Sequence, residues 1–189
     1  MPMIEQCILD QIQPVVLVGG QSKRFGRDKL IEPINGTPMA AIPINTLRQV
    51  FGPRVAIVGQ CDQQVTSLAD RVIHDPYPGL GPVGGLCAAL EYSKSDVFVC
   101  AGDLVAIDEQ TIRTIIAASF ETPDALAYLA MSDRLQPTIG LYRADCVSHF
   151  KNAVETRKLK LGMVLSQESV FRVPVDSGTI VNINRPDDL

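Results

Sequence analysis

Short runs rich in Val and Ile alternate with helix-length segments through the first two thirds of the chain. We expect strands at 15–18, 55–58, 71–74 and 96–101. Segments of helical length lie at 38–50, 83–92 and 108–119, the last capped by Asp108. An alternating order of strands and helices favours parallel strands with helices on both faces of the sheet. The sequence therefore predicts an α/β fold, three layers deep, with a mostly parallel central sheet.

The last third of the chain is less regular. Runs at 125–131 and 138–142 predict two paired strands around the polar turn Ser132-Asp133-Arg134. Helices are expected at 144–155 and 159–167, a last strand near 171–175, and a return of 181–184 toward the sheet. No repeat or linker interrupts the 189 residues, so we expect one domain over 1–189.

Composition excludes several classes of protein. With 46% hydrophobic and 20% charged residues the chain has the profile of a soluble globular protein, and a net charge of −4 argues against nucleic acid as a partner. Five scattered cysteines, without a Cys-x-x-Cys pair, form neither a zinc nor a disulfide framework and fit a reducing cytoplasm. No signal peptide or membrane span is expected, because the apolar runs are too short.

The segment from Leu17 to Lys29 follows the first strand and contains three glycines and four Lys or Arg side chains. Glycines let a backbone approach a ligand, and successive N–H groups can cradle an anion. Ligands of open α/β sheets bind at the carboxyl ends of the strands, so this loop suits a polyphosphate. It is not a Walker loop, since five residues separate Gly20 from Gly26. A tight turn with solvated cations is the alternative.

Asp103 follows the apolar run at 97–100 and should face the same edge of the sheet. A single carboxylate beside phosphates suits Mg²⁺, although an Asp here could merely cap a turn. Asn182 and Asn184 alternate on a late strand and could join Asp103 on a metal or substrate; turn formation is again the alternative.

The segment from Gly79 to Gly84 matches Gly-x-Gly-x-x-Gly, with Asp103 at the expected distance. The fingerprint should leave its strand directly, yet Asp75-Pro76-Tyr77-Pro78 intervenes, which argues against a nicotinamide cofactor. We expect instead a helix N-terminus whose glycines approach a nucleobase or sugar. Asp75 could contact that ligand or simply initiate a turn.

Five motifs in order resemble those of the molybdenum cofactor guanylyltransferase family, and the resemblance covers nearly the whole chain. They are Leu17-x-Gly-Gly-x-Ser-x-Arg-Phe-Gly-x-Asp-Lys29, Gly81-Pro-x-Gly-Gly-Leu86, Gly102-Asp103, Gln136-Pro137-Thr138 and Asn182-Ile-Asn184-Arg-Pro-Asp. The resemblance implies a Rossmann-like nucleotidyltransferase fold. It also implies transfer of GMP from GTP, with Mg²⁺, to Mo-molybdopterin, and transient contact with molybdenum insertion proteins or apo-molybdoenzymes.

Roles of individual residues follow from the same resemblance. GTP is expected to contact Leu17, Val18, Gly19, Gly20, Lys29, Asp75 and Asp103. The catalytic residues are expected to be Arg24, Lys29 and Asp103, with Asp103 also binding the metal. The acceptor is expected to contact Gln136, Pro137, Thr138, Asn182 and Asn184 in the second half of the chain. A related cytidylyl- or sugar-phosphate nucleotidyltransferase and a catalytically silent nucleotide-binding regulator remain as alternatives.

Overall fold

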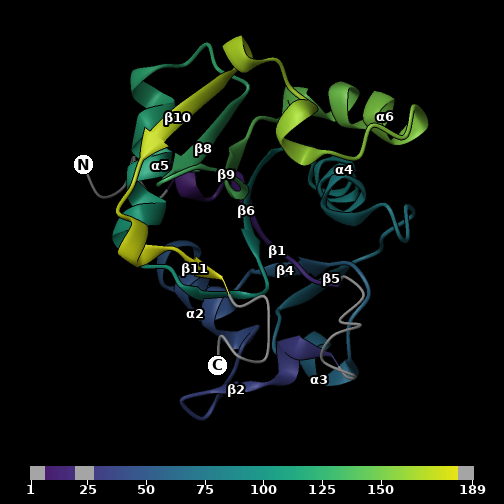
Figure 1. Cartoon of the computed structure of the whole chain (residues 1–189), viewed down its shortest axis with the longest axis vertical. Coiled ribbons are helices and arrows are strands. Elements are labelled where there is room, and N and C mark those ends of the chain that lie inside the picture. Colours follow the sequence, from purple (N-terminus) through teal and green to yellow (C-terminus); the bar gives the residue numbers. More distant parts are fainter. Residues whose placement is uncertain (1–6, 20–27, 183–189) are drawn as a thin grey trace.

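A seven-stranded sheet with the strand order β10-β8-β9-β6-β1-β4-β5 forms the centre of the molecule (Figure 1). The structure is a computed structural model that describes residues 7–19 and 28–182. The strands are β1 (Ile12–Leu17), β4 (Ala56–Val58), β5 (Arg71–Ile73), β6 (Asp96–Ala101), β8 (Ala127–Met131), β9 (Leu135–Tyr142) and β10 (Val170–Pro174). β9 is antiparallel to both its neighbours, and the other adjacent pairs are parallel, which confirms the predicted mostly parallel sheet.

Helices cover both faces of this sheet. They are α2 (Ala41–Phe51), α4 (Gly81–Ser93), α5 (Glu109–Glu121) and α6 (Val147–Glu155). Consecutive side chains of a strand point to opposite faces, so Val16 packs in one core with Leu47 of α2 and Ile115 of α5. Val15 packs in the other core with Leu86 of α4 and, farther along, Phe150 of α6. The three-layer α/β/α architecture expected from the sequence is confirmed.

In the described part of the chain, several short strands, one short helix and five 3₁₀ turns lie between and beside these layers. β2 (Pro33–Ile34) and β3 (Thr37–Pro38) form a small hairpin, and β7 (Leu104–Ala106) pairs antiparallel with β11 (Val181–Asn182). The remaining elements are α3 (Gln63–Thr66) and the 3₁₀ turns η1 (Lys29–Ile31), η2 (Ala144–Cys146), η3 (Leu161–Met163), η4 (Gln167–Ser169) and η5 (Ser177–Thr179). Among the residues described, no helix is both long and apolar enough to cross a bilayer.

The helix expected at 159–167 is wrong. Only the turns η3 and η4 form there, and a Cβ added to Gly162 would lie 3.4 Å from Pro137 Cγ. A glycine inside a helix costs about 1 kcal/mol relative to alanine, and here the segment packs on β9 at Pro137 instead. The hairpin of β8 and β9 and the N-cap of α5 are confirmed, since Asp108 Oδ1 accepts a hydrogen bond from Thr111 N at 2.7 Å.

Candidate active site

The carboxyl ends of β4, β1 and β6 meet at one edge of the sheet. In the strand register Leu17 lies opposite Val58 on one side and Ala101 on the other. Two further hydrogen bonds extend this edge: Val18 N donates to Val58 O, and Gly102 N donates to Leu17 O, both at 2.9 Å. The loop that begins after Leu17 therefore leaves from the middle of the sheet, as open α/β sheets require of a binding loop.

Two glycines let neighbouring loops lie in contact at this edge. Gly19 has φ +98°, and a Cβ there would lie 2.7 Å from Gln60 O. Gly59 has φ +116°, and a Cβ there would lie only 1.9 Å from Val18 O. The sequence predicted that Gly19 lets a ligand approach, whereas the described contact is with the loop that follows β4. The two loops thus lie in direct contact, with no room for a side chain at either glycine.

Lys29 and Asp103 form an ion pair at this edge. Lys29 Nζ lies 2.5 Å from Asp103 Oδ2, although the residues are 74 positions apart in the sequence. Lys29 opens η1 and Asp103 follows β6. Both side chains are largely shielded, with 19% and 22% of their surface exposed. The structure therefore brings together two of the three residues that the sequence assigned to catalysis.

Asp28 holds Lys29 in place, a role that the sequence analysis missed. Asp28 Oδ1 accepts a hydrogen bond from Leu30 N at 3.0 Å, and Oδ2 accepts one from Asp62 N at 2.9 Å. The first bond caps η1, for which Asp before a helical turn is a recognisable signal. The second bond joins the loop after β1 to the loop after β4, which no local pattern could show. In that second loop, burial and the charges of Asp28 and Asp62 raise the pKa of the Cys61 thiol to about 11.

The donor set fits a metal ion that arrives with a nucleotide. The part of the chain that the structure describes contains no cluster of three or more His, Cys, Asp or Glu side chains that could hold an ion by themselves. Mg²⁺ is commonly held by one or two carboxylates together with substrate phosphates and water. Asp103 supplies one such carboxylate just after the end of β6, and the neighbouring Lys29 supplies a positive charge for phosphates.

Asp75 lies farther along the same edge of the sheet. It follows β5, which is separated from β6 by β4 and β1 in the strand order. Asp75 Oδ1 accepts a hydrogen bond from Tyr77 N at 2.8 Å, so the turn-initiating role considered from the sequence is confirmed. Gly79 and Gly81 follow with φ +80° and +63°, and α4 begins at Gly81, two residues before the predicted start.

The residues expected to contact the acceptor lie on the opposite side of β6. β9 runs against β6, so its first residues, Gln136 to Thr138, lie toward the carboxyl end of β6. Gln136 Nε2 donates to Ser132 Oγ at 3.3 Å, and Tyr142 Oη donates to Pro137 O at 2.6 Å. The backbone of Asn182 pairs with Leu104, directly after Asp103. Gly20, Arg24 and Asn184 lie outside the described residues.

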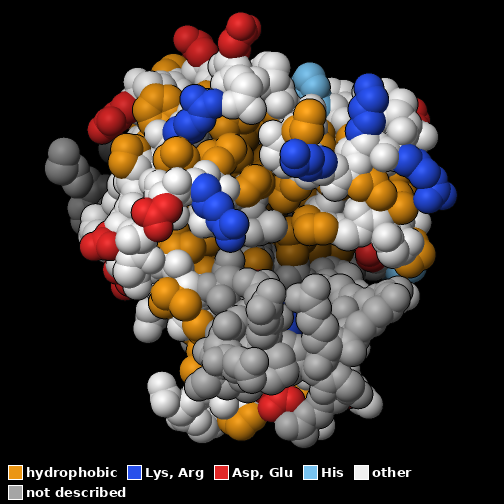
Figure 2. Space-filling view, in the orientation of Figure 1, with side chains coloured by type: hydrophobic (Ala, Val, Ile, Leu, Met, Phe, Trp, Pro, Cys, Tyr) orange, Lys and Arg blue, Asp and Glu red, His pale blue; other side chains and the backbone are white. Residues whose placement is uncertain are grey.

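Figure 2 shows which kinds of side chain lie on one face of the molecule. Hydrophobic side chains gather over the centre of its upper part, and Lys and Arg side chains stand among them. In the upper region of Figure 1 lie β8, β9, β10 and α6, the elements of the second half of the chain.

Comparisons with known proteins agree with this arrangement. The family model described as "MobA-like NTP transferase domain" matches residues 14–170. A protein of Mycobacterium bovis (strain BCG / Pasteur 1173P2), named "Probable molybdenum cofactor guanylyltransferase", is 30% identical over 177 residues, which cover 90% of this chain and 87% of that protein.

Solved structures show the same fold. A crystal structure of a protein from Aquifex aeolicus has a TM-score of 0.76 and 26% identity, covering 92% of this chain and 93% of the other. The structure of molybdopterin-guanine dinucleotide biosynthesis protein A from Archaeoglobus fulgidus has a TM-score of 0.72 and 21% identity. The match covers 93% of this chain and 94% of that chain. The Rossmann-like nucleotidyltransferase fold is thus shared over nearly the full length of each chain.

Proposed function

Because this chain belongs to the MobA-like NTP transferase family, we propose that it transfers GMP from GTP to the terminal phosphate of Mo-molybdopterin and releases pyrophosphate. It is a nucleotidyltransferase, and the reaction named for the mycobacterial relative supports the choice of donor and acceptor. The observation that carries the proposal is the Lys29–Asp103 pair at the edge where β1 and β6 end. A cation for phosphates and a carboxylate for a divalent ion are held there side by side.

The reaction is an attack of an acceptor phosphate oxygen on the α-phosphorus of GTP. The bond from the α-phosphorus to the bridging oxygen breaks, and its electron pair leaves with pyrophosphate. Lys29 and Arg24 stabilise the negative charge that grows on the transferring group and on pyrophosphate, while the backbone from Leu17 to Gly20 holds the phosphates. Asp103 would hold Mg²⁺, which neutralises phosphate charge when it is bound.

Positioning and charge stabilisation are sufficient for this chemistry, so no covalent nucleophile is needed. Cys61 is the described thiol in the loop beside Asp28, and its raised pKa, about 11, keeps it protonated at neutral pH. The thiol of Cys100, one residue before the end of β6, also has a raised pKa because it is fully buried.

We assign the two substrates to the two halves of a single domain. The first half binds GTP, with Asp75 as a further contact. The second half binds the acceptor through Gln136 to Thr138 and through Asn182 and Asn184. We also propose that the protein works in the cytoplasm, where its five free cysteines would stay reduced, and that it contacts molybdenum insertion proteins or apo-molybdoenzymes transiently.

Pyrophosphate release tests the proposal. The protein is incubated with Mg²⁺, molybdopterin loaded with molybdate, and GTP, CTP, ATP or UTP in turn. We expect release with GTP and its loss in Asp103→Asn. Asp70→Asn is the matched control, because Asp70 is also an ion-paired carboxylate but lies with Arg48, away from β6. Release with CTP and not GTP would show a cytidylyltransferase, and binding without release for any nucleotide would show a silent regulator.

A further inference from the structure

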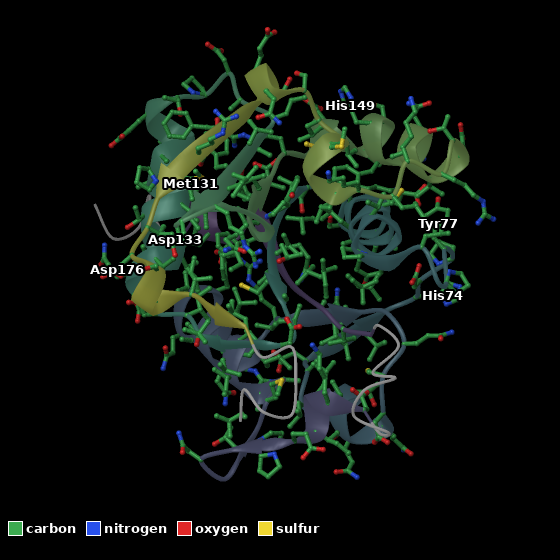
Figure 3. All side chains as sticks on the ribbon, viewed as in Figure 1. His74, Tyr77, Met131, Asp133, His149 and Asp176 are labelled. Carbon is green, nitrogen blue, oxygen red and sulfur yellow. The ribbon has the colours of Figure 1, made fainter. Side chains whose placement is uncertain are left out.

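The segment that carries Asp75 is fastened to α4 and α6 by a chain of polar contacts. The Tyr77 hydroxyl donates a hydrogen bond to Glu91 Oε2 at 2.7 Å. The other oxygen of that carboxylate, Oε1, lies 2.9 Å from Lys151 Nζ of α6. In Figure 3 Tyr77 lies beside α4, across the molecule from Met131 and Asp133. Lys151, Glu91, Tyr77 and Asp75 thus form one connected series, because Asp75 accepts the N–H of Tyr77.

The backbone of Tyr77 is also confined. Its carbonyl oxygen accepts a hydrogen bond from Leu80 N at 3.2 Å. A Cβ added to Gly84, in the first turns of α4, would lie 2.9 Å from that oxygen and 3.1 Å from Tyr77 Cβ. The segment from Asp75 to Leu80 is therefore folded closely onto the start of α4, and the Tyr77 side chain fastens it farther along the same helix.

The charges along this series strengthen the hydrogen bond from the Tyr77 hydroxyl to Glu91. The hydrogen bond from Lys151 is the largest influence on Glu91, and together with that from Tyr77 it outweighs burial and lowers the pKa of the carboxyl. The hydrogen bond to Glu91 raises the pKa of the Tyr77 hydroxyl, which stays protonated as a donor. A hydrogen bond to an ionised acceptor is stronger than one between neutral groups. Cys87 lies nearby, with its Sγ 3.9 Å from Glu91 Oε2, and stays a protonated thiol.

We propose that Tyr77 is a positioning residue for the nucleotide: Glu91 fixes its hydroxyl, and Tyr77 in turn fixes the Asp75 carboxylate. This inference rests on the proposed function, in which Asp75 contacts GTP. Because Lys151 belongs to α6, the same series ties the nucleotide side of the molecule to the half that binds the acceptor. Loss of the Tyr77 hydroxyl loosens Asp75 without removing any group that touches a reacting atom.

The test compares two tyrosines of the same region. Tyr77→Phe keeps the ring and removes the bond to Glu91. Tyr92→Phe, at the end of α4, likewise removes one hydroxyl contact, the 3.0 Å bond from Arg71 Nη1, and serves as the control. We expect Tyr77→Phe to raise the Kd and the KM for Mg²⁺-GTP about five- to tenfold with kcat within about twofold. Tyr92→Phe should leave all three unchanged. Glu91→Ala, which removes the acceptor of that bond, should match Tyr77→Phe.

A double-mutant cycle separates positioning from general loosening. If Tyr77 acts through Asp75, then Asp75→Ala weakens GTP binding and adding Tyr77→Phe weakens it no further. Hydrogen exchange at Leu80 N–H should also speed up in Tyr77→Phe. An unchanged Kd in a folded Tyr77→Phe, or effects that multiply in the double variant, would overturn the positioning role alone. If the wild-type protein binds no nucleotide, both the positioning role and the proposed function are overturned. If it prefers CTP, the donor is CTP, and the double-mutant cycle is measured with CTP in place of GTP.

Discussion

Gly59→Ala probes how the loops at the edge of the candidate active site are held together. A Cβ at this position would lie 1.9 Å from Val18 O, whereas ordinary contacts begin near 3.4 Å, so the carbonyl would have to retreat by about 1.5 Å. That movement strains the hydrogen bond from Val18 N to Val58 O, in a region where both residues are buried. An unsatisfied buried amide and a positive φ in alanine together cost about 3 kcal/mol or more.

Urea unfolding measures this cost directly, with Gly52→Ala as the control. Gly52 also has a positive φ, +76°, but a Cβ there meets nothing within 4 Å. We expect Gly52→Ala to lower the free energy of unfolding less, by about 1–2 kcal/mol, which is the cost of the backbone conformation alone. Because Val18 precedes the loop that we propose binds the phosphates, Gly59→Ala should also weaken nucleotide binding under conditions where it is folded. Equal stability of the two variants would refute the reasoning, since only the steric contact distinguishes them.

Three further substitutions test the Lys29–Asp103 ion pair, the Arg48–Asp70 ion pair and the hydrophobic core. Lys29→Met should lower pyrophosphate release about a hundredfold or more, because charge on the leaving group loses a stabilising cation. Asp70→Asn should cost about 1–2 kcal/mol of unfolding free energy at neutral pH. Hydrogen bonds from Arg48 lower the pKa of Asp70 in the folded state, so that loss should shrink as the pH falls below about 4, which pH-dependent denaturation would show. Phe150→Ala should lower stability by about 3–5 kcal/mol in the same assay, because Phe150 is fully buried against Tyr142.

Local patterns were enough to predict most of the fold. The apolar run of β6 was predicted at the residues where the strand forms, 96–101, because a strand buried on both faces is continuous and ends at polar residues. Asp108 was recognised as an N-cap because the N–H group that donates to its carboxylate, that of Thr111, lies only three residues away. Where a segment packs on a distant strand, the local pattern fails: the stretch at 159–167 was expected to be helical, but it lies against Pro137.

The sequence predicted which strand ends meet at the candidate site, but it did not predict the contacts between the residues there. The rule that parallel strands end at one edge predicted that Lys29 and Asp103 share a site, but not that they pair directly. Neither the hydrogen bond from Asp62 to Asp28 nor the approach of Val18 O to Gly59 leaves a trace in local sequence, because each joins different loops. Such contacts depend on the register between β1 and β4.

The antiparallel pairing of β7 with β11 has a consequence for the order of assembly during synthesis. Leu104, directly after Asp103, pairs with Asn182, so the corner that carries the carboxylate is bordered by a strand from the far end of the chain. On the ribosome β6 and β7 emerge long before β11. The nascent chain can form the core around β1 and β6 early, but it acquires this border of the candidate active site only after β11 has been made. Turnover should therefore begin only after the strand at 181–182 has left the exit tunnel.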